Sequence, residues 1–152
     1  MISQVLKTSV MSIGIGFLLY LLQHLLVTQY LNTFLSANLI TILIALLAIN
    51  SATLGIVLTK VRDLVEAHGN GHCFESTKQQ MILSIKEQVS LIATSMVLLI
   101  FQNNKLTDLN ESLIMFIEVA VISVFAYALI VLYDTAKSVL IIIDFDFKNE
   151  EG

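Results

Sequence analysis

The sequence predicts an all-α fold, an integral membrane four-helix bundle. The chain has 152 residues, of which 57% are hydrophobic and 13% charged, and its mean hydropathy is +0.86. Soluble domains carry about 45–50% apolar and about 25% charged residues. A chain this short and this apolar cannot hide its hydrophobic side chains inside a water-soluble globule. The composition therefore excludes a soluble enzyme and a protein that binds nucleic acid directly.

The distribution of charge divides the chain into four spans. Residues 8–59 contain no Asp, Glu, Lys or Arg, and because a spanning helix needs about 20 apolar residues, this run holds two helices. We expect their turn at the polar residues of 31–38. A second charge-free run covers 88–104, and the only charge in the fourth apolar segment is Glu118. The expected spans are 10–31, 39–59, 84–104 and 112–133.

Helices 2, 3 and 4 are expected to extend beyond the membrane. Apolar spacing continues after the second span to about His68, where Gly69-Asn70-Gly71 favours a turn. The fourth helix over 112–143 would be about 48 Å long, against a hydrocarbon core of about 30 Å. Residues 60–88 are thus predicted to form a helical hairpin and 134–152 a tail, both outside the bilayer. No linker interrupts the chain, so we expect a single domain over its whole length.

The basic residues predict the orientation of the helices, because basic loops resist translocation across a membrane. Under this arrangement Lys105 stands alone on one side. The other side holds Lys7, Lys60, Arg62, Lys78, Lys86, Lys137 and Lys148. We therefore expect a multi-pass protein of the cell inner membrane, with both termini, the hairpin and the single cysteine, Cys73, in the cytoplasm.

Several polar side chains fall inside the expected spans. Ionisable residues within a membrane are energetically expensive and by default indicate a function. Glu118 and His24 fall at similar depth, where they could hold or relay a proton, since histidine titrates near neutral pH. The structural alternative is that Glu118 ties helices together through hydrogen bonds. The other polar candidates, which either line a path or join helices, are Gln23, Asn50, Ser51, Thr94 and Ser95.

Small residues four positions apart predict close packing of helices, because they let two backbones approach. We expect these positions to form contact surfaces within one subunit or between subunits. The pairs are Ser12–Gly16, Ala48–Ala52 and Ser51–Gly55.

The tail carries two features that predict contacts with protein. A helical run that is apolar on every face must be buried, either against the hairpin of the same subunit or against another chain. We expect a homo-oligomer. This run contains Val139, Leu140, Ile142 and Ile143. Residues 143–147 then alternate apolar and acidic side chains, as in an extended segment. Either this segment docks on a cytoplasmic protein, or it rests on the membrane surface as a frayed terminus. The docking candidates are Asp144, Phe145, Asp146 and Phe147.

The sequence contains no catalytic or metal-binding pattern. Structural zinc sites need four ligands in paired spacings, whereas the hairpin turn offers one cluster without a second pair, and we expect a solvated loop tip there. The cluster comprises His68, His72, Cys73 and Glu75. No Cys-x-x-Cys pair and no Gly-rich phosphate loop is present in the sequence. We therefore expect a protein that is not an enzyme and uses no cofactor or metal.

In length, number of spans, cytoplasmic termini and charged cytoplasmic hairpin, the chain resembles the small four-helix membrane subunits of bacterial antiphage defence systems, such as the membrane component of Kiwa. The resemblance implies a membrane subunit that accompanies a cytoplasmic effector, and it carries over no functional residues. We expect a non-enzymatic, oligomeric inner-membrane anchor or sensor in the lipid bilayer that docks a cytoplasmic partner. The alternative is a small homo-oligomeric ion channel or proton-linked transporter that uses Glu118.

Overall fold

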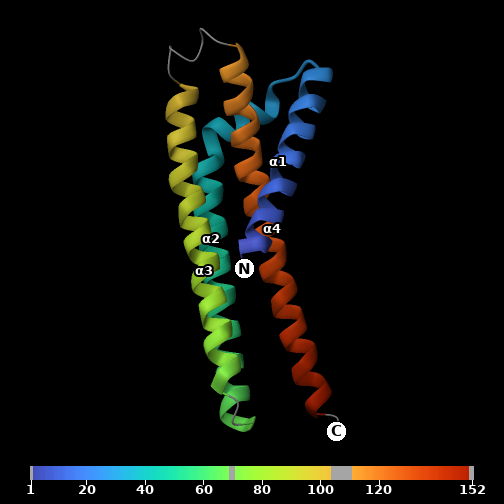
Figure 1. Ribbon diagram of the computed structural model, residues 1–152, viewed down its shortest axis with the longest axis vertical. Helices are drawn as coiled ribbons and strands as arrows, with labels where there is room; N and C mark the ends of the chain where they lie inside the picture. Colours follow the sequence, from blue (N-terminus) through green and yellow to red (C-terminus); the bar gives the residue numbers. More distant parts are fainter. Residues whose placement is uncertain (1, 69–70, 104–110, 151–152) are drawn as a thin grey trace.

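The computed structural model describes residues 2–68, 71–103 and 111–150, with side chains at 5–62, 78–79, 81–103 and 111–137. These residues form four helices and no strand (Figure 1): α1 (Ile2–Leu25), α2 (Tyr30–His68), α3 (Gly71–Gln102) and α4 (Glu111–Glu150). Each helix contains a segment long and apolar enough to cross a membrane. These segments are Val5–Leu25, Tyr30–Arg62, Met81–Gln102 and Glu111–Lys137. The predicted all-α fold with four candidate membrane spans is confirmed.

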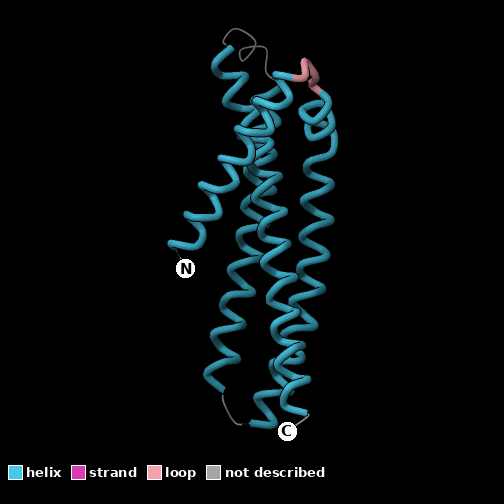
Figure 2. Tube along the Cα trace, turned by 90° about the vertical axis from the view of Figure 1, so that its right-hand side faces the viewer, coloured by secondary structure: helices cyan, strands magenta, loops and turns pink. Residues whose placement is uncertain are grey.

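The connection between the first two helices lies earlier than the sequence predicted. α1 ends at Leu25 and α2 begins at Tyr30, so the short connection between them (pink in Figure 2) precedes the expected turn at 31–38. The expected first span, 10–31, therefore runs too far, and the second, 39–59, begins too late. Residues 31–38 are helical, and their polar side chains are accommodated by bonds to carbonyl groups of the preceding turn: Asn38 Nδ2 donates to the Phe34 carbonyl at 2.9 Å.

A Schellman motif closes α1. The Thr28 N–H donates to the Gln23 carbonyl at 3.1 Å, and the Val27 N–H donates to the His24 carbonyl at 3.2 Å. Val27 has a φ of 50° at the position that glycine usually occupies. A β-branched residue in this left-handed region is strained, and the turn forms here without the glycine or asparagine that usually marks one.

α2 supplies the central face of the bundle. Its buried residues recur at steps of three, four or seven positions, so they lie on one side of the helix, against α3 and α4. They are Asn32, Leu35, Leu39, Leu43, Leu46, Asn50, Val57 and Val61. α4 contributes the other large share of the main core, with Ile117, Val121, Ile122, Val124 and Ala128. A smaller cluster of Val57, Val61 and Met81 joins α2 to α3 near their connection.

α1 packs mainly against α4, and the two helices cross closely at Gly16. A Cβ atom at Gly16 would collide with the Ser123 hydroxyl and would lie 3.0 Å from the Ser123 backbone nitrogen. Ser12, one turn earlier, is buried. The predicted close packing at Ser12 and Gly16 is therefore confirmed as a contact within the subunit.

The other small-residue pairs lie on the outside of the subunit. Ala48, Ser51 and Ala52 are exposed, and a Cβ atom at Gly55 would meet nothing within 4 Å. These positions therefore do not pack against α1, α3 or α4 among the described residues.

α2, α3 and α4 continue well past the N-terminal end of α1 (Figure 1). We call residues 60–68, 71–78 and 138–150 the three-helix extension. Its helices end at the α2–α3 connection and at the C-terminus, which lie at the same end of the molecule (Figures 1 and 2). Within the extension, α4 diverges from the α2–α3 hairpin (Figure 1).

The ends of α2 and α4 confirm one prediction and contradict another. α2 ends at His68, as predicted, but α4 remains helical to Glu150, so the expected extended segment at 143–147 is wrong. No Gly or Pro lies between 111 and 150 to end the helix, and the helix that precedes the alternating residues therefore continues through them.

Candidate functional site: polar groups among the packed helices

Glu118 lies near the start of α4, at the end of the bundle opposite the extension. It is half-buried, and its carboxyl group lies beside the side chain of Asn32 on α2, which is buried. The predicted neighbour, His24, is exposed and stacks on Tyr20 with ring centroids 6.4 Å apart. In the described part of the chain no ion pair joins Glu118 to His24. Glu118 is thus placed as a link between α4 and α2.

Two further polar groups lie at the same end of the bundle. The Ser36 hydroxyl of α2 donates to Gln102 Oε1 at the end of α3, at 3.0 Å. Gln23 of α1 is buried, and its Oε1 atom has no hydrogen-bond partner among the described residues. These groups lie between helices, where they can fix the contacts of one helix with the next.

A buried polar layer lies in the half of the bundle nearer the extension. Asn50 of α2 is 1% exposed and Gln88 of α3 is 3% exposed. They are nearly equally far along the chain from the 69–70 connection, so the antiparallel packing of α2 on α3 puts them at one level. Neither amide group finds a hydrogen-bond partner in the ranges that the structure describes. Because a buried polar group without a partner costs about 1–3 kcal/mol, this layer is under-satisfied.

Glu87 and Tyr127 belong to the same layer, and sequence reasoning missed both. The Glu87 carboxyl group lies beside the Tyr127 hydroxyl of α4, and Tyr127 is buried. Glu87 lies directly before the charge-free run 88–104, so it is not among the polar residues inside that run. Once the antiparallel pairing of α2 with α3 is known, counting outward from the 69–70 connection pairs Asn50 with Gln88 and places Glu87 next to this level.

The other predicted polar residues have different surroundings. Ser95 is fully buried, and its hydroxyl donates to the Ile92 carbonyl of its own helix at 2.8 Å. Thr94 is exposed and donates to the Ser90 carbonyl at 2.8 Å. Ser51 is also exposed. Ser51 and Thr94 therefore do not line the interior of the bundle.

Two predicted clusters lie outside the described side chains. One is the apolar and docking part of the tail, with Val139, Leu140, Ile142, Ile143, Asp144, Phe145, Asp146 and Phe147. The other is the cluster at the hairpin turn, with His68, His72, Cys73 and Glu75. Among the side chains that are described, no group of three His, Cys, Asp or Glu residues could hold a metal ion.

Comparison with known proteins adds no relative to this description. A scan against protein-family models, a search of curated proteins and a search of solved structures found no match for the chain. The functional argument therefore rests on the geometry and chemistry of the chain itself.

Proposed function

We propose that the protein is a non-enzymatic, oligomeric anchor or sensor subunit of the cell inner membrane that docks a cytoplasmic protein, with a role in antiphage defence. In this proposal the four-helix part spans the bilayer and the three-helix extension faces the cytoplasm. The defence role is suggested by the architecture, which resembles that of membrane subunits that accompany cytoplasmic effectors.

The single observation that carries the proposal is the three-helix extension. Helices longer than the bilayer is thick must project from it, and here three of them project at the same end. The expected spans put seven of the eight basic residues on the side from which the extension projects, and basic segments favour the cytoplasmic side. A helical platform at the membrane surface suits the binding of a soluble protein better than it suits catalysis.

Oligomerisation is proposed from the apolar run of α4 in the extension. Val139, Leu140, Ile142 and Ile143 follow one another on a helix, so no face of the helix is polar there. α4 diverges from the α2–α3 hairpin at this level (Figure 1), which leaves the hairpin poorly placed to cover the run. A second copy of the chain would cover it in a closed symmetric assembly.

A small homo-oligomeric channel or proton-linked transporter that uses Glu118 is the second candidate. The observation that favours it is the pair of buried amides without partners, Asn50 and Gln88. However, Leu39 and Leu43 fill the interior between the level of Glu118 and that of Asn50, and both are at most 3% exposed. A continuous path inside one subunit is blocked by these leucines, so a pore would have to run between subunits.

Affinity purification followed by mass spectrometry tests the docking proposal. We expect a cytoplasmic protein to co-purify with the wild type and to be lost from the double variant Phe145→Ala, Phe147→Ala. The matched control removes two exposed aromatic rings from membrane-spanning segments, Phe17→Ala with Phe116→Ala, and should retain the partner. Membrane insertion and oligomer size should be unchanged in both variants. Retention of every co-purifying protein by the tail variant, or no co-purifying protein with the wild type, would overturn the proposal.

The channel alternative makes a different prediction. If Glu118 carries protons, the conservative variant Glu118→Gln should abolish proton flux in proteoliposomes that contain the purified protein. If Glu118 only joins α4 to α2, the variant should leave the partner bound and the wild type should show no flux above empty liposomes.

A further inference from the structure

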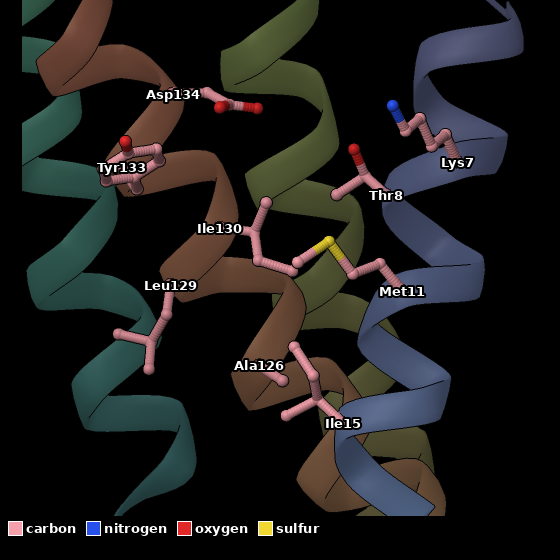
Figure 3. A pocket seen from close by; sticks show the side chains of 9 residues that line it. All are labelled: Lys7, Thr8, Met11, Ile15, Ala126, Leu129, Ile130, Tyr133 and Asp134. Atoms are coloured by element: carbon pink, nitrogen blue, oxygen red, sulfur yellow. The ribbon is translucent and has the colours of Figure 1, made fainter.

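A groove of about 520 Å³ lies between α1 and α4 (Figure 3). It forms because the two helices meet closely at Gly16 and Ser123, and the N-terminal end of α1 then moves away from the other helices (Figure 2). Its volume falls within the range of small-molecule sites, about 300–1,000 Å³. Both walls belong to candidate membrane spans, so in a bilayer the open side of the groove faces lipid.

The groove has an apolar part and a charged rim. In the apolar part, Met11 of α1 lies next to Ile130 of α4, and Ile15 lies next to Ala126 (Figure 3). At one end of the groove, Lys7 and Asp134 point towards each other across it (Figure 3). The rim therefore presents one cation and one anion.

The rim lies at the depth where lipid headgroups are found. Lys7 is close to the start of the candidate span Val5–Leu25, and Asp134 is close to the end of the span Glu111–Lys137. The apolar part of the groove extends from this level towards the middle of both spans. A ligand with a charged head and an apolar tail fits this arrangement in only one direction.

We propose that the groove binds one membrane phospholipid with a zwitterionic, primary-amine headgroup, of the phosphatidylethanolamine class. The lipid phosphate accepts hydrogen bonds from the Lys7 ammonium and the Thr8 hydroxyl, which also lines the rim. The headgroup ammonium donates to the Asp134 carboxylate, and one acyl chain lies along the apolar part of the groove. The inference goes beyond the proposed docking function and does not depend on it.

The charges of the rim distinguish this headgroup from other common ones. An anionic headgroup such as phosphatidylglycerol would place its single charge near Lys7 but could offer Asp134 only neutral hydroxyl donors, without the charge of an ammonium group. A phosphatidylcholine headgroup carries both charges, but its quaternary ammonium has no N–H to donate. Hydrogen bonds between charged partners are about twice as strong as neutral ones, so the primary amine should be preferred over choline.

Native mass spectrometry of the protein released from nanodiscs tests the proposal. The nanodiscs contain equal amounts of phosphatidylethanolamine, phosphatidylcholine and phosphatidylglycerol. We expect the wild type to retain one phosphatidylethanolamine per chain, preferred about tenfold over phosphatidylcholine, as one charge-assisted hydrogen bond would give. Asp134→Asn should bring the ratio of retained phosphatidylethanolamine to retained phosphatidylcholine close to one. Lys7→Gln should lower the retention of all three lipids.

Lys137→Gln is the matched control, because Lys137 is an exposed cation one turn beyond Asp134 that does not line the groove. It should leave both the retained lipid and the preference unchanged. Equal retention of phosphatidylethanolamine and phosphatidylcholine by the wild type would overturn the proposal. Preference for phosphatidylglycerol, retention of no lipid, or an equal effect of Lys137→Gln and Asp134→Asn would overturn it too. None of these outcomes bears on whether a cytoplasmic protein docks on the extension.

Discussion

The close crossing of α1 and α4 makes one glycine sensitive to the smallest possible substitution. In Gly16→Ala the new methyl group meets the Ser123 hydroxyl and lies 3.0 Å from the Ser123 nitrogen and 3.1 Å from its Cα atom. Two of these three atoms are backbone, so α1 and α4 must separate. Overpacking of this kind costs about 1–3 kcal/mol, whereas replacing a helical glycine by alanine gains about 1 kcal/mol from helix propensity.

Gly14→Ala provides the control, because a Cβ atom at Gly14 would meet nothing within 4 Å. Both glycines lie in α1, so the gain from helix propensity is shared, and the difference between the variants isolates the packing cost. We expect Gly16→Ala to have a free energy of unfolding about 1–3 kcal/mol lower than Gly14→Ala, measured by equilibrium unfolding in mixed micelles. Adding Ser123→Ala to Gly16→Ala should restore only part of the loss, because the backbone contacts remain. Equal stability of the two alanine variants would refute the close crossing.

Three other substitutions test separate parts of the structure. Val27→Gly should raise the free energy of unfolding by about 1 kcal/mol, because it relieves the left-handed backbone that closes α1; a lower value in micelle unfolding would argue against that turn. Asn50→Leu should raise it by about 1–3 kcal/mol, because it replaces buried amide atoms without partners by an apolar side chain; a loss of stability would mean that the amide is satisfied in the membrane. Ile142→Asp would bury an unpaired charge at the proposed subunit contact, so chemical cross-linking should change from oligomer to monomer, and a monomeric wild type would contradict the proposed assembly.

The sequence predicted the number and class of the helices because membrane insertion depends on composition over long segments. The charge-free run 8–59 could hold only two spans, and Gly69-Asn70-Gly71 marked the end of α2 at His68. The prediction of the first connection was wrong because the polar residues that usually indicate a turn lie at 31–38. There the polar side chains are accommodated within a helix, and the actual turn depends on a strained valine.

The polar layer shows a second limit of sequence reasoning. Glu118 and Asn50 were predictable as intramembrane polar residues, since each lies within a long apolar segment. Their neighbours were not, because contacts between helices depend on how α2, α3 and α4 pair along their lengths. Gln88 becomes relevant only when the antiparallel pairing with Asn50 is known, and Glu87 only when Tyr127 is brought next to it. The same limit explains why Glu118 was matched with His24 instead of Asn32.

The central claim, that the three-helix extension faces the cytoplasm, can be tested at the single native cysteine, Cys73. The measurement is its rate of modification by a membrane-impermeant maleimide, in intact cells and after permeabilisation of the inner membrane. A cysteine introduced by Lys105→Cys in a Cys73→Ser background serves as the reference for the opposite side. We predict that Cys73 is protected in intact cells and reacts after permeabilisation, while the reference cysteine reacts in both. Modification of Cys73 in intact cells as fast as that of the reference cysteine would contradict the proposed orientation and the docking function that depends on it.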